Sequence, residues 1–217
     1  MQVFKDVAQC SPEWFALKYG KVGGSTSKGL FVQSDTLLLE ILSELTEPFV
    51  LQDEGYVSKD MERGNLLEPI GIQRIGEFAK VNFERYGWLL SDEIDIIGIS
   101  PDGITSDLKI SCEVKCPGAK RHIETMLAKE IPSDNRHQCL HYFTVNPELE
   151  KHYFGSFRPE CDYPLYIKEL TRESEIDLGT KAKPVVKQVD EWVDIAKFAA
   201  KKLKTDLHNA LAQLDKI

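Results

Sequence analysis

Asp102, Glu113 and Lys115 are the side chains in this sequence that could do chemistry together. Glu113 and Lys115 are two positions apart, so on a strand they point to one face, while Val114 between them points into a core. Two acids and a lysine held together are costly to bury without a partner, and a divalent metal ion removes that cost. Mg²⁺ prefers carboxylate oxygens and usually takes one or two of them, with water and phosphate oxygens completing its shell. These residues therefore predict a magnesium site at which Lys115 holds or polarises an attacking water.

A hairpin is the simplest arrangement that positions these side chains. The β-branched run 94–99 predicts one strand, turn residues follow it, and residues 110–115 predict a second strand. This arrangement places Asp102 at the end of the first strand, opposite Glu113. An ordinary surface hairpin with a cross-strand salt bridge fits the same pattern, and the pattern alone does not decide between the two.

Two further stretches could bring polar groups to such a site. The glycine-rich loop 20–29 carries Ser25 and Ser27, and its hydroxyls and backbone N–H groups could receive an anion if a helix begins there. A flexible turn is the alternative. Glu68 lies in the middle of a predicted helix, directly before Pro69, which removes a backbone donor and should kink that helix. A solvated helix carboxylate is the alternative for Glu68.

Hydrophobic periodicity and capping residues predict the remaining elements. Gln138 and Tyr142 are four apart on one predicted helix and share a face, although simple amphipathic spacing also explains them. The expected elements are helices that start at Ser11-Pro12 or cover 35–45, 61–79, 119–130 and 133–145, strands at 81–90, 152–157 and 165–170, and a long amphipathic helix from 183 onward.

Composition limits the classes of function. A length of 217 residues with 42% hydrophobic content predicts one domain with a real core. The net charge of −8 argues against non-specific coating of nucleic acid but leaves room for a local basic channel. No apolar run approaches the length of a membrane span, and the N-terminus does not resemble a signal peptide. We therefore expect a cytoplasmic protein without a membrane partner.

The cysteines, histidines and C-terminal lysines indicate no further site. Five cysteines at irregular spacing predict free thiols. His137 and His141 are four apart but lack a third ligand at zinc spacing. The polar side of the C-terminal helix, which is either solvated or in contact with phosphates, carries Lys197, Lys201, Lys202 and Lys204.

Five fragments fall in the order and spacing of one family. The chain resembles the phage lambda exonuclease family, also called the YqaJ-like viral recombinase nucleases, within the PD-(D/E)xK nuclease superfamily. The resemblance covers about residues 11–157, and its specific part is the Ser-Pro-Asp-Gly and Glu-x-Lys-Cys-Pro pair. The fragments are Trp14-x3-Lys18-x-Gly20 with Ser25, Gly64-x3-Glu68-Pro69, Ser100-Pro101-Asp102-Gly103, Glu113-Val114-Lys115-Cys116-Pro117 and Gln138-x3-Tyr142.

The resemblance implies a Mg²⁺-dependent exonuclease that digests one strand of linear double-stranded DNA from its 5′ end. The product would be a 3′ single-stranded overhang for a phage annealing protein. The implied fold is α/β (α+β), with a mixed central sheet flanked by helices and a long C-terminal helix. We expect one exonuclease domain over 1–217, with a nuclease core at about 11–170 and the helix at about 183–215. Family members form ring-shaped trimers that thread DNA, and the chain would act in the bacterial host of a phage or prophage.

The resemblance also implies roles for single residues. Asp102 and Glu113 would hold the metal with the Val114 carbonyl, and Lys115 would position or activate the water. Glu68 would help to hold a second ion, and Mn²⁺ could replace Mg²⁺. Gln138 and Tyr142 would orient the scissile phosphate or the metal shell.

A terminal 5′-phosphate would be bound by a second set of residues. Lys18 stands where the family usually carries an arginine, and lysine gives a point charge where arginine makes a bidentate contact. Ser25 and Ser27 would supply hydroxyls to the same phosphate, and Ser100 would also contact the substrate.

Other classes of function remain open at this stage. One is an endonuclease of the same superfamily, or a nuclease tied to a helicase. Iron–sulfur members of that group carry a cysteine cluster near the C-terminus, whereas the last cysteine here is Cys161. Another is a scaffold that binds DNA ends without cutting, although the joint presence of Asp102, Glu113 and Lys115 argues against it. A small metal-binding protein unrelated to DNA would need all five fragments to coincide by chance.

Overall fold

Two β-sheets organise the molecule, and a short link joins them. The computed structural model describes residues 1–50 and 59–216. Its strands are β1 (Gln2–Phe4), β2 (Trp88–Leu90), β3 (Gly98–Ile99), β4 (Gly103–Ile104), β5 (Ile110–Lys115), β6 (Lys151–Phe157), β7 (Leu165–Thr171), β8 (Glu175–Asp177) and β9 (Val186–Gln188). One sheet has the order β1-β2-β3 and is antiparallel, and the other has the order β4-β5-β6-β7, with β5 and β6 parallel. The chain passes from the first sheet to the second through residues 100–102.

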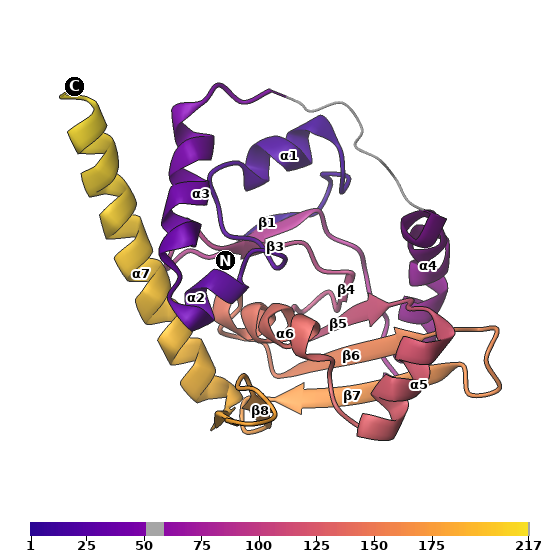
Figure 1. The fold of residues 1–217 in the computed structure, drawn as a ribbon. Helices are drawn as coiled ribbons and strands as arrows, with labels where there is room; N and C mark the ends of the chain where they lie inside the picture. Colours follow the sequence, from indigo (N-terminus) through magenta and orange to yellow (C-terminus); the bar gives the residue numbers. More distant parts are fainter. Residues whose placement is uncertain (51–58, 217) are drawn as a thin grey trace.

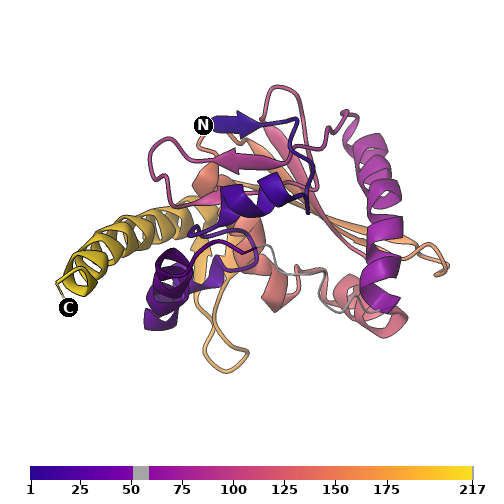
Figure 2. The same ribbon diagram turned by 90° about the horizontal axis from the view of Figure 1, so that it is seen from above.

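Helices cover these sheets from both sides. They are α1 (Pro12–Lys18), α2 (Lys28–Val32), α3 (Asp35–Thr46), α4 (Lys59–Ala79), α5 (Ala119–Ala128), α6 (Ser133–Val145) and α7 (Val189–Leu214). In Figure 1, α2, α3 and α7 lie together at one side of the molecule, and α4 and α5 lie at the other. Figure 2 gives the same separation from above. The predicted α/β (α+β) class, with a mixed sheet flanked by helices and a long C-terminal helix, is confirmed.

The predicted hairpin is wrong in its partner strand and its turn. The strand that pairs with β5 is β4, which follows Asp102, whereas β3 belongs to the other sheet. The turn lies at residues 105–109, where the Asp107 carboxylate accepts hydrogen bonds from the Thr105 hydroxyl at 2.6 Å and the Lys109 N–H at 3.1 Å. Side chains of this kind stabilise turns by bonding the backbone two residues on. Asp102 therefore precedes its strand instead of ending one.

The predicted strand at 81–90 is mostly irregular. Only Trp88 to Leu90 form β2, and residues 81–87 make one isolated bridge, between Glu84 and Ile104. The aromatic residues of this segment do not predict a strand correctly because the segment crosses between the sheets. Phe83 packs in the cluster beneath α4, while Tyr86 belongs to the main core.

Close packing of α4 on the second sheet fixes where its side chains point. A Cβ at Gly71 would lie 2.6 Å from Val114 Cγ1, and one at Gly155 would lie 2.5 Å from Ile75 Cδ1. Both contacts are closer than a side chain allows, so glycine at these positions lets the helix approach the strands. Val114 is buried in this cluster, as the strand pattern predicts. Because α4 meets β5 at Gly71, residue 68, one turn earlier, lies beside the same strand.

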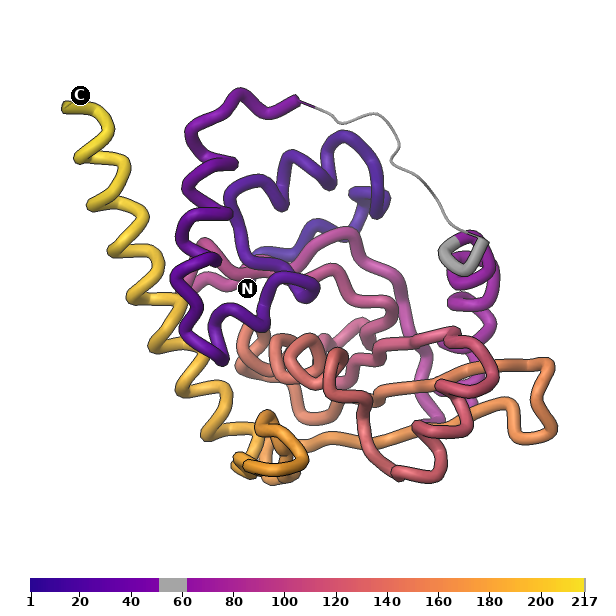
Figure 3. The backbone as a smooth tube through the Cα atoms, in the orientation of Figure 1, coloured from indigo at the N-terminus to yellow at the C-terminus, as the bar shows by residue number. Residues whose placement is uncertain are grey.

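The C-terminal helix begins later than predicted because residues 186–188 form β9. Figure 3 follows the chain through this small sheet into α7, whose end lies at the edge of the molecule. Three lysines on its polar side pair with acids of the loop before β3, so these contacts attach the helix to the first sheet. The pairs are Lys197 and Lys201 with Glu93, and Lys204 with Asp95. No helix among the described residues is long and apolar enough to cross a membrane.

Candidate active site

Asp102, Glu113, Lys115 and Tyr142 lie together at the junction of the two sheets. Asp102 Oδ2 accepts a hydrogen bond from the Val114 backbone N–H at 2.8 Å, which ties the link between the sheets to β5. The Glu113 carboxylate is fully buried, accepts a hydrogen bond from the Tyr142 hydroxyl at 2.7 Å and pairs with the Lys115 ammonium. The parallel pairing of β5 with β6 keeps this strand in the middle of its sheet. The sequence pattern and the structure thus bring the same acids and lysine to one place.

The charges of this cluster are only partly balanced. Burial, with Glu113 and Glu68 nearby, raises the pKa of Asp102 well above its ordinary value. Burial lowers the pKa of Lys115, but the neighbouring Glu113 and Asp102 carboxylates outweigh it, so the pKa is raised overall. Lys115 is therefore an ammonium donor at neutral pH. An added cation would relieve the repulsion among the acids, which is the environment expected of a metal site.

Glu68 reaches this cluster from α4. The helix continues through Pro69 and packs on Val114 of β5 at Gly71, so Glu68, one turn earlier, is close enough to feel the charges of Glu113 and Lys115. Burial raises the pKa of Glu68, the Arg85 guanidinium lowers it, and the nearby Glu113 carboxylate raises it again. Arg85 Nη2 donates to Glu68 Oε1 at 2.9 Å. Glu68 thus interacts with the other acids through its charge and with Arg85 through a direct ion pair.

The oxygens of this cluster suit a hard cation. Among the described residues, no group of three or more His, Cys, Asp or Glu side chains is gathered closely enough to enclose a metal ion. Mg²⁺ does not need such a cage, because it usually binds through one or two carboxylates and keeps several waters. Asp102 and Glu113 with the Val114 carbonyl could supply that set. The raised pKa of Asp102 gives a physical reason for a cation to bind there.

Gln138 connects the glycine-rich loop with α6. A Cβ at Gly24 would lie 3.2 Å from Gln138 Cγ and 3.4 Å from its Nε2, so the loop backbone packs directly on this side chain. Tyr142, one turn further along α6, bonds to Glu113. The shared helix face predicted for Gln138 and Tyr142 therefore runs from the glycine-rich loop to the acids.

Lys18 lies over an aromatic ring that is anchored beside Asp102. Its ammonium is 3.8 Å from the centre of the Trp14 ring, a cation–π contact. The Trp14 indole N–H donates to the Ser100 hydroxyl at 2.6 Å and to the Gly87 carbonyl at 3.0 Å. Ser100 is two residues before Asp102, so the indole fixes Lys18 relative to the acids.

Two of the predicted substrate contacts, Ser27 and Ser100, use their hydroxyl protons in hydrogen bonds within the protein. The Ser27 side chain is fully buried, and its hydroxyl donates to the Gly24 carbonyl at 2.7 Å. The Ser100 hydroxyl donates to the Gly87 carbonyl at 2.8 Å while it accepts from Trp14. Neither hydroxyl proton is free for a phosphate. Ser25, in contrast, is exposed on the loop surface.

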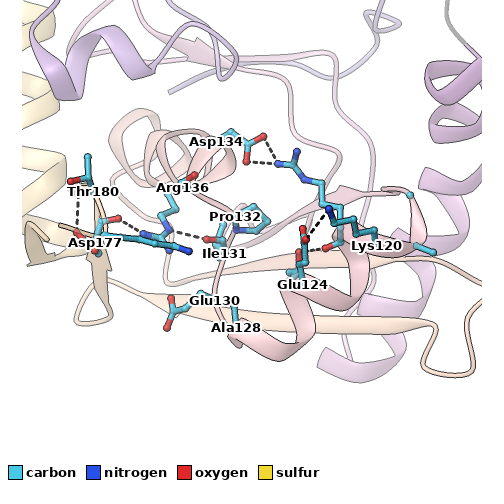
Figure 4. Close-up of a pocket in the computed structure, with 17 residues that line it drawn as sticks. Lys120, Glu124, Ala128, Glu130, Ile131, Pro132, Asp134, Arg136, Asp177 and Thr180 are labelled. Carbon is cyan, nitrogen blue, oxygen red and sulfur yellow. Dashed lines mark hydrogen bonds and ion pairs between the residues drawn. The ribbon is translucent and has the colours of Figure 1, made fainter. Parts of the chain in front are cut away.

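A separate pocket lies away from these residues (Figure 4). A cavity of about 900 Å³ opens between α5, the start of α6 and the turn after β8, and none of the predicted site residues lines it. An ion pair between Arg121 and Asp134 crosses its upper part in Figure 4, and Arg136 donates to the Ile131 and Asp177 carbonyls. Because the described residues that line it bring no pair of neighbouring carboxylates together with a lysine, as Asp102, Glu113 and Lys115 are brought together, the pocket is not the candidate chemical site.

Sequence reasoning missed Arg85 and Gln9. Gln9 Nε2 donates to the carbonyls of Tyr86 and Pro101 at 2.9 and 3.0 Å, and Gln9 Oε1 accepts from Arg85 at 3.3 Å. Neither residue lies in a motif or at a telling spacing from the acids. The only sequence feature that could have indicated a role for Arg85 is its charge within a segment predicted to be a strand.

Comparisons with known proteins identify the family. Residues 13–147 match the model of the YqaJ-like viral recombinase domain. The chain belongs to this family. The matched residues include every candidate site residue named above except Gln9, and they end before β6 and α7. A comparison with curated proteins found no match.

Solved structures support the same fold for this YqaJ-like domain. The crystal structure of an alkaline exonuclease (LHK-Exo) from Laribacter hongkongensis matches with a TM-score of 0.71 and 19% sequence identity, over 95% of this chain and 99% of that one. The structure of LHK-Exo in complex with dAMP matches with a TM-score of 0.72, the same identity and the same coverage. At this level of identity the likeness establishes the fold.

Proposed function

We propose that the chain is a metal-dependent deoxyribonuclease that digests linear double-stranded DNA from its 5′ ends and leaves 3′ single-stranded overhangs. The observation that carries this proposal is the cluster of Asp102, Glu113 and Lys115 at the junction of the sheets. Membership of the YqaJ-like viral recombinase family and a fold shared with an alkaline exonuclease support it.

In this proposal Asp102, Glu113 and the Val114 carbonyl hold a Mg²⁺ ion, and Glu68 contributes to a second one; Mn²⁺ could serve in its place. A bound ion would polarise the scissile phosphate and stabilise the charge that develops on its oxygens. Lys115 donates to the attacking water or to a phosphate oxygen. Tyr142, bonded to Glu113, keeps that carboxylate oriented.

The 5′ polarity is assigned to the Lys18 side of the site. The Lys18 side chain lies beside Gly23, and Ser25 is two residues further along the same loop with an exposed side chain. Lys18 and Ser25 would bind a terminal 5′-phosphate. Gln138, packed against the same loop, would orient the scissile phosphate. Lysine offers a charge without the paired donors of arginine, so the preference for a phosphate would be electrostatic.

The wider assignment follows from the family. The whole chain would act as one exonuclease domain in the cytoplasm of a bacterial host that carries a phage or prophage. Its overhangs would pass to a single-strand annealing protein, and a ring of three copies would keep the enzyme on its DNA.

Digestion of end-labelled DNA tests this function. Linear duplex DNA would be labelled separately at its 5′ and 3′ ends and incubated with and without Mg²⁺, beside a closed circular duplex. We expect Mg²⁺-dependent release of the 5′ label first, with the circle untouched. Cutting of the circle would favour the endonuclease, and tight end binding without cutting in any divalent metal would favour the scaffold.

A further inference from the structure

The ion pair between Arg85 and Glu68 is part of a chain of contacts that ends beside Asp102. Arg85 Nη2 lies 2.9 Å from Glu68 Oε1 and 3.3 Å from Gln9 Oε1. Gln9 in turn donates to the Pro101 carbonyl, one residue before Asp102, at 3.0 Å. Four segments that are distant in sequence are thereby joined through one guanidinium and one amide.

These contacts contribute little to the stability of the fold. The Arg85 side chain is 54% exposed, and ion pairs of such exposed side chains contribute little to the free energy of unfolding. Its position is more informative than its strength. Glu68 is only 21% exposed and lies near the Glu113 and Asp102 carboxylates, which repel it. Without a fixed partner, the Glu68 side chain would turn away from this cluster toward water.

Glu68 and Asp102 also depend on this connection for their relative position. Glu68 is on α4 and Asp102 is in the link between the sheets, and both segments contact Val114 of β5, but that contact does not fix the direction of the Glu68 side chain. The contacts through Arg85 and Gln9 run from the Glu68 carboxylate to the backbone next to Asp102. Partners of this kind orient metal ligands, and their loss typically weakens metal binding by about 10–100-fold.

We propose that Arg85 is a positioning residue that, with Gln9, holds the Glu68 carboxylate toward Asp102 and Glu113 so that the site can bind a divalent cation. This inference rests on the proposed function, because it assumes that the acids bind a metal. It assigns no contact between Arg85 and the DNA.

The direction in which removal of Arg85 changes the affinity for a cation distinguishes a positioning role from a purely electrostatic one. Arg85 is positive, so its removal should by electrostatics alone strengthen the binding of a cation. We expect the opposite for Arg85→Met: binding of Mn²⁺ to the metal-free protein, followed by the electron paramagnetic resonance signal of the free ion, should weaken about tenfold. Arg85→Lys, which keeps a donor and the charge, should restore part of this loss.

Two further variants complete the test. Arg74→Met is the control for loss of an arginine. Arg74 is exposed on α4, the helix that carries Glu68, and pairs with Glu77 at 3.1 Å, so this variant should bind Mn²⁺ like the wild type. In a Glu68→Ala background, Arg85→Met should cause no additional loss, because Arg85 acts through Glu68. Thermal melting without metal should give similar midpoints for wild type and Arg85→Met, which excludes a folding defect.

The outcomes distinguish the inference from the function on which it rests. Unchanged or tighter Mn²⁺ binding by Arg85→Met, or an equal loss in the Glu68→Ala background, would overturn the positioning role while the wild type still binds metal and cuts DNA. A wild-type protein that neither binds Mn²⁺ nor cuts would overturn the proposed function, before any variant is compared.

Discussion

Lys115 contacts Glu113, and its raised pKa makes it a proton donor rather than a base. A residue in this state can bind the water or the phosphate at the site, but it contributes little to holding the rest of a long DNA. Its effect should therefore fall on cutting and not on affinity.

Lys115→Ala should reduce cutting by at least about 100-fold, which is the lower range for loss of a positioned proton-transfer group. DNA binding, measured by fluorescence anisotropy without Mg²⁺, should change by less than a few fold. Lys109→Ala is a matched control, since Lys109 precedes the same strand and pairs with Glu150 at 2.6 Å on the surface. Equal loss of cutting and binding would contradict the assignment.

Lys18→Ala should slow digestion mainly on 5′-phosphorylated ends. Burial lowers the pKa of Lys18, and the Trp14 ring fixes its ammonium in place. A hydrogen bond to a charged group contributes about 1.5–3 kcal/mol, so the initial rate on such ends should fall by about tenfold or more. The same DNA with 5′-hydroxyl ends is the control, and an identical slowdown on both would remove the proposed role.

Sequence spacing predicts that two residues meet at the site only when both belong to the same motif. Glu113 and Lys115 share a strand, so their common face follows from the period of two. Ser100 stands in a family motif, but its hydroxyl bonds to the Gly87 carbonyl, which the sequence does not place near it. Arg85 and Gln9 meet Glu68 only in the folded chain, so no spacing could have identified them.

At the scale of elements, the hydrophobic pattern and the capping residues predict the bounds of a helix or strand well where these bounds depend on residues within that element. Helix α6 and strands β6 and β7 lie at or within one residue of their predicted bounds. The hairpin failed because turn residues occur at 100–103 and again at 105–109, and only the second group reverses the chain within one sheet. Pairing between distant strands, such as β1 with β2, has no local signal at all.

Buried histidines on α6 and β6 should make the fold sensitive to acid. Burial lowers the pKa of His137 and of His141 to about 4, and that of His152 to about 3, from an ordinary value of 6.5. The unfolded chain then binds more protons than the folded one, so stability is full above pH 6.5 and is lost as the pH falls toward 4. Each histidine can contribute up to about 1.4 kcal/mol per pH unit.

His137→Leu should weaken this pH dependence. Within the described residues neither ring nitrogen of His137 has a hydrogen-bond partner, so leucine removes the titrating group without breaking a bond. Urea unfolding at pH 7.5, 6.5, 5.5 and 4.5 should give a shallower loss of unfolding free energy than in the wild type. His208→Leu, on the exposed side of α7, controls for loss of a histidine as such. A wild-type slope in His137→Leu would contradict the prediction.

At the scale of the whole molecule, the net negative charge opposes the binding of DNA, on which the proposed enzyme must remain. The chain carries a net charge of −8, and the lysines of α7 that could have offset it locally are paired with Glu93, Asp95 and Asp206. Attraction over the whole surface cannot hold such a protein on a polyanion at physiological salt. A ring of subunits around the DNA would keep the enzyme on its substrate without a basic surface, since a ring does not depend on electrostatic attraction to retain the DNA.

The ring of three copies proposed from the family resemblance would enclose DNA in this way, so we expect a trimer in solution. Light scattering coupled to size exclusion should give three times the 24.6 kDa mass of the chain at the concentrations used for digestion. A ring that encloses its substrate should also continue to digest after excess unlabelled linear DNA is added, because enzyme already on an end cannot exchange. A monomer mass would refute the ring, and digestion that stops at once on addition of the competitor would show that the copies do not enclose the DNA. Closed circular competitor is the control, since it offers no end and should leave the rate unchanged even in the first minutes.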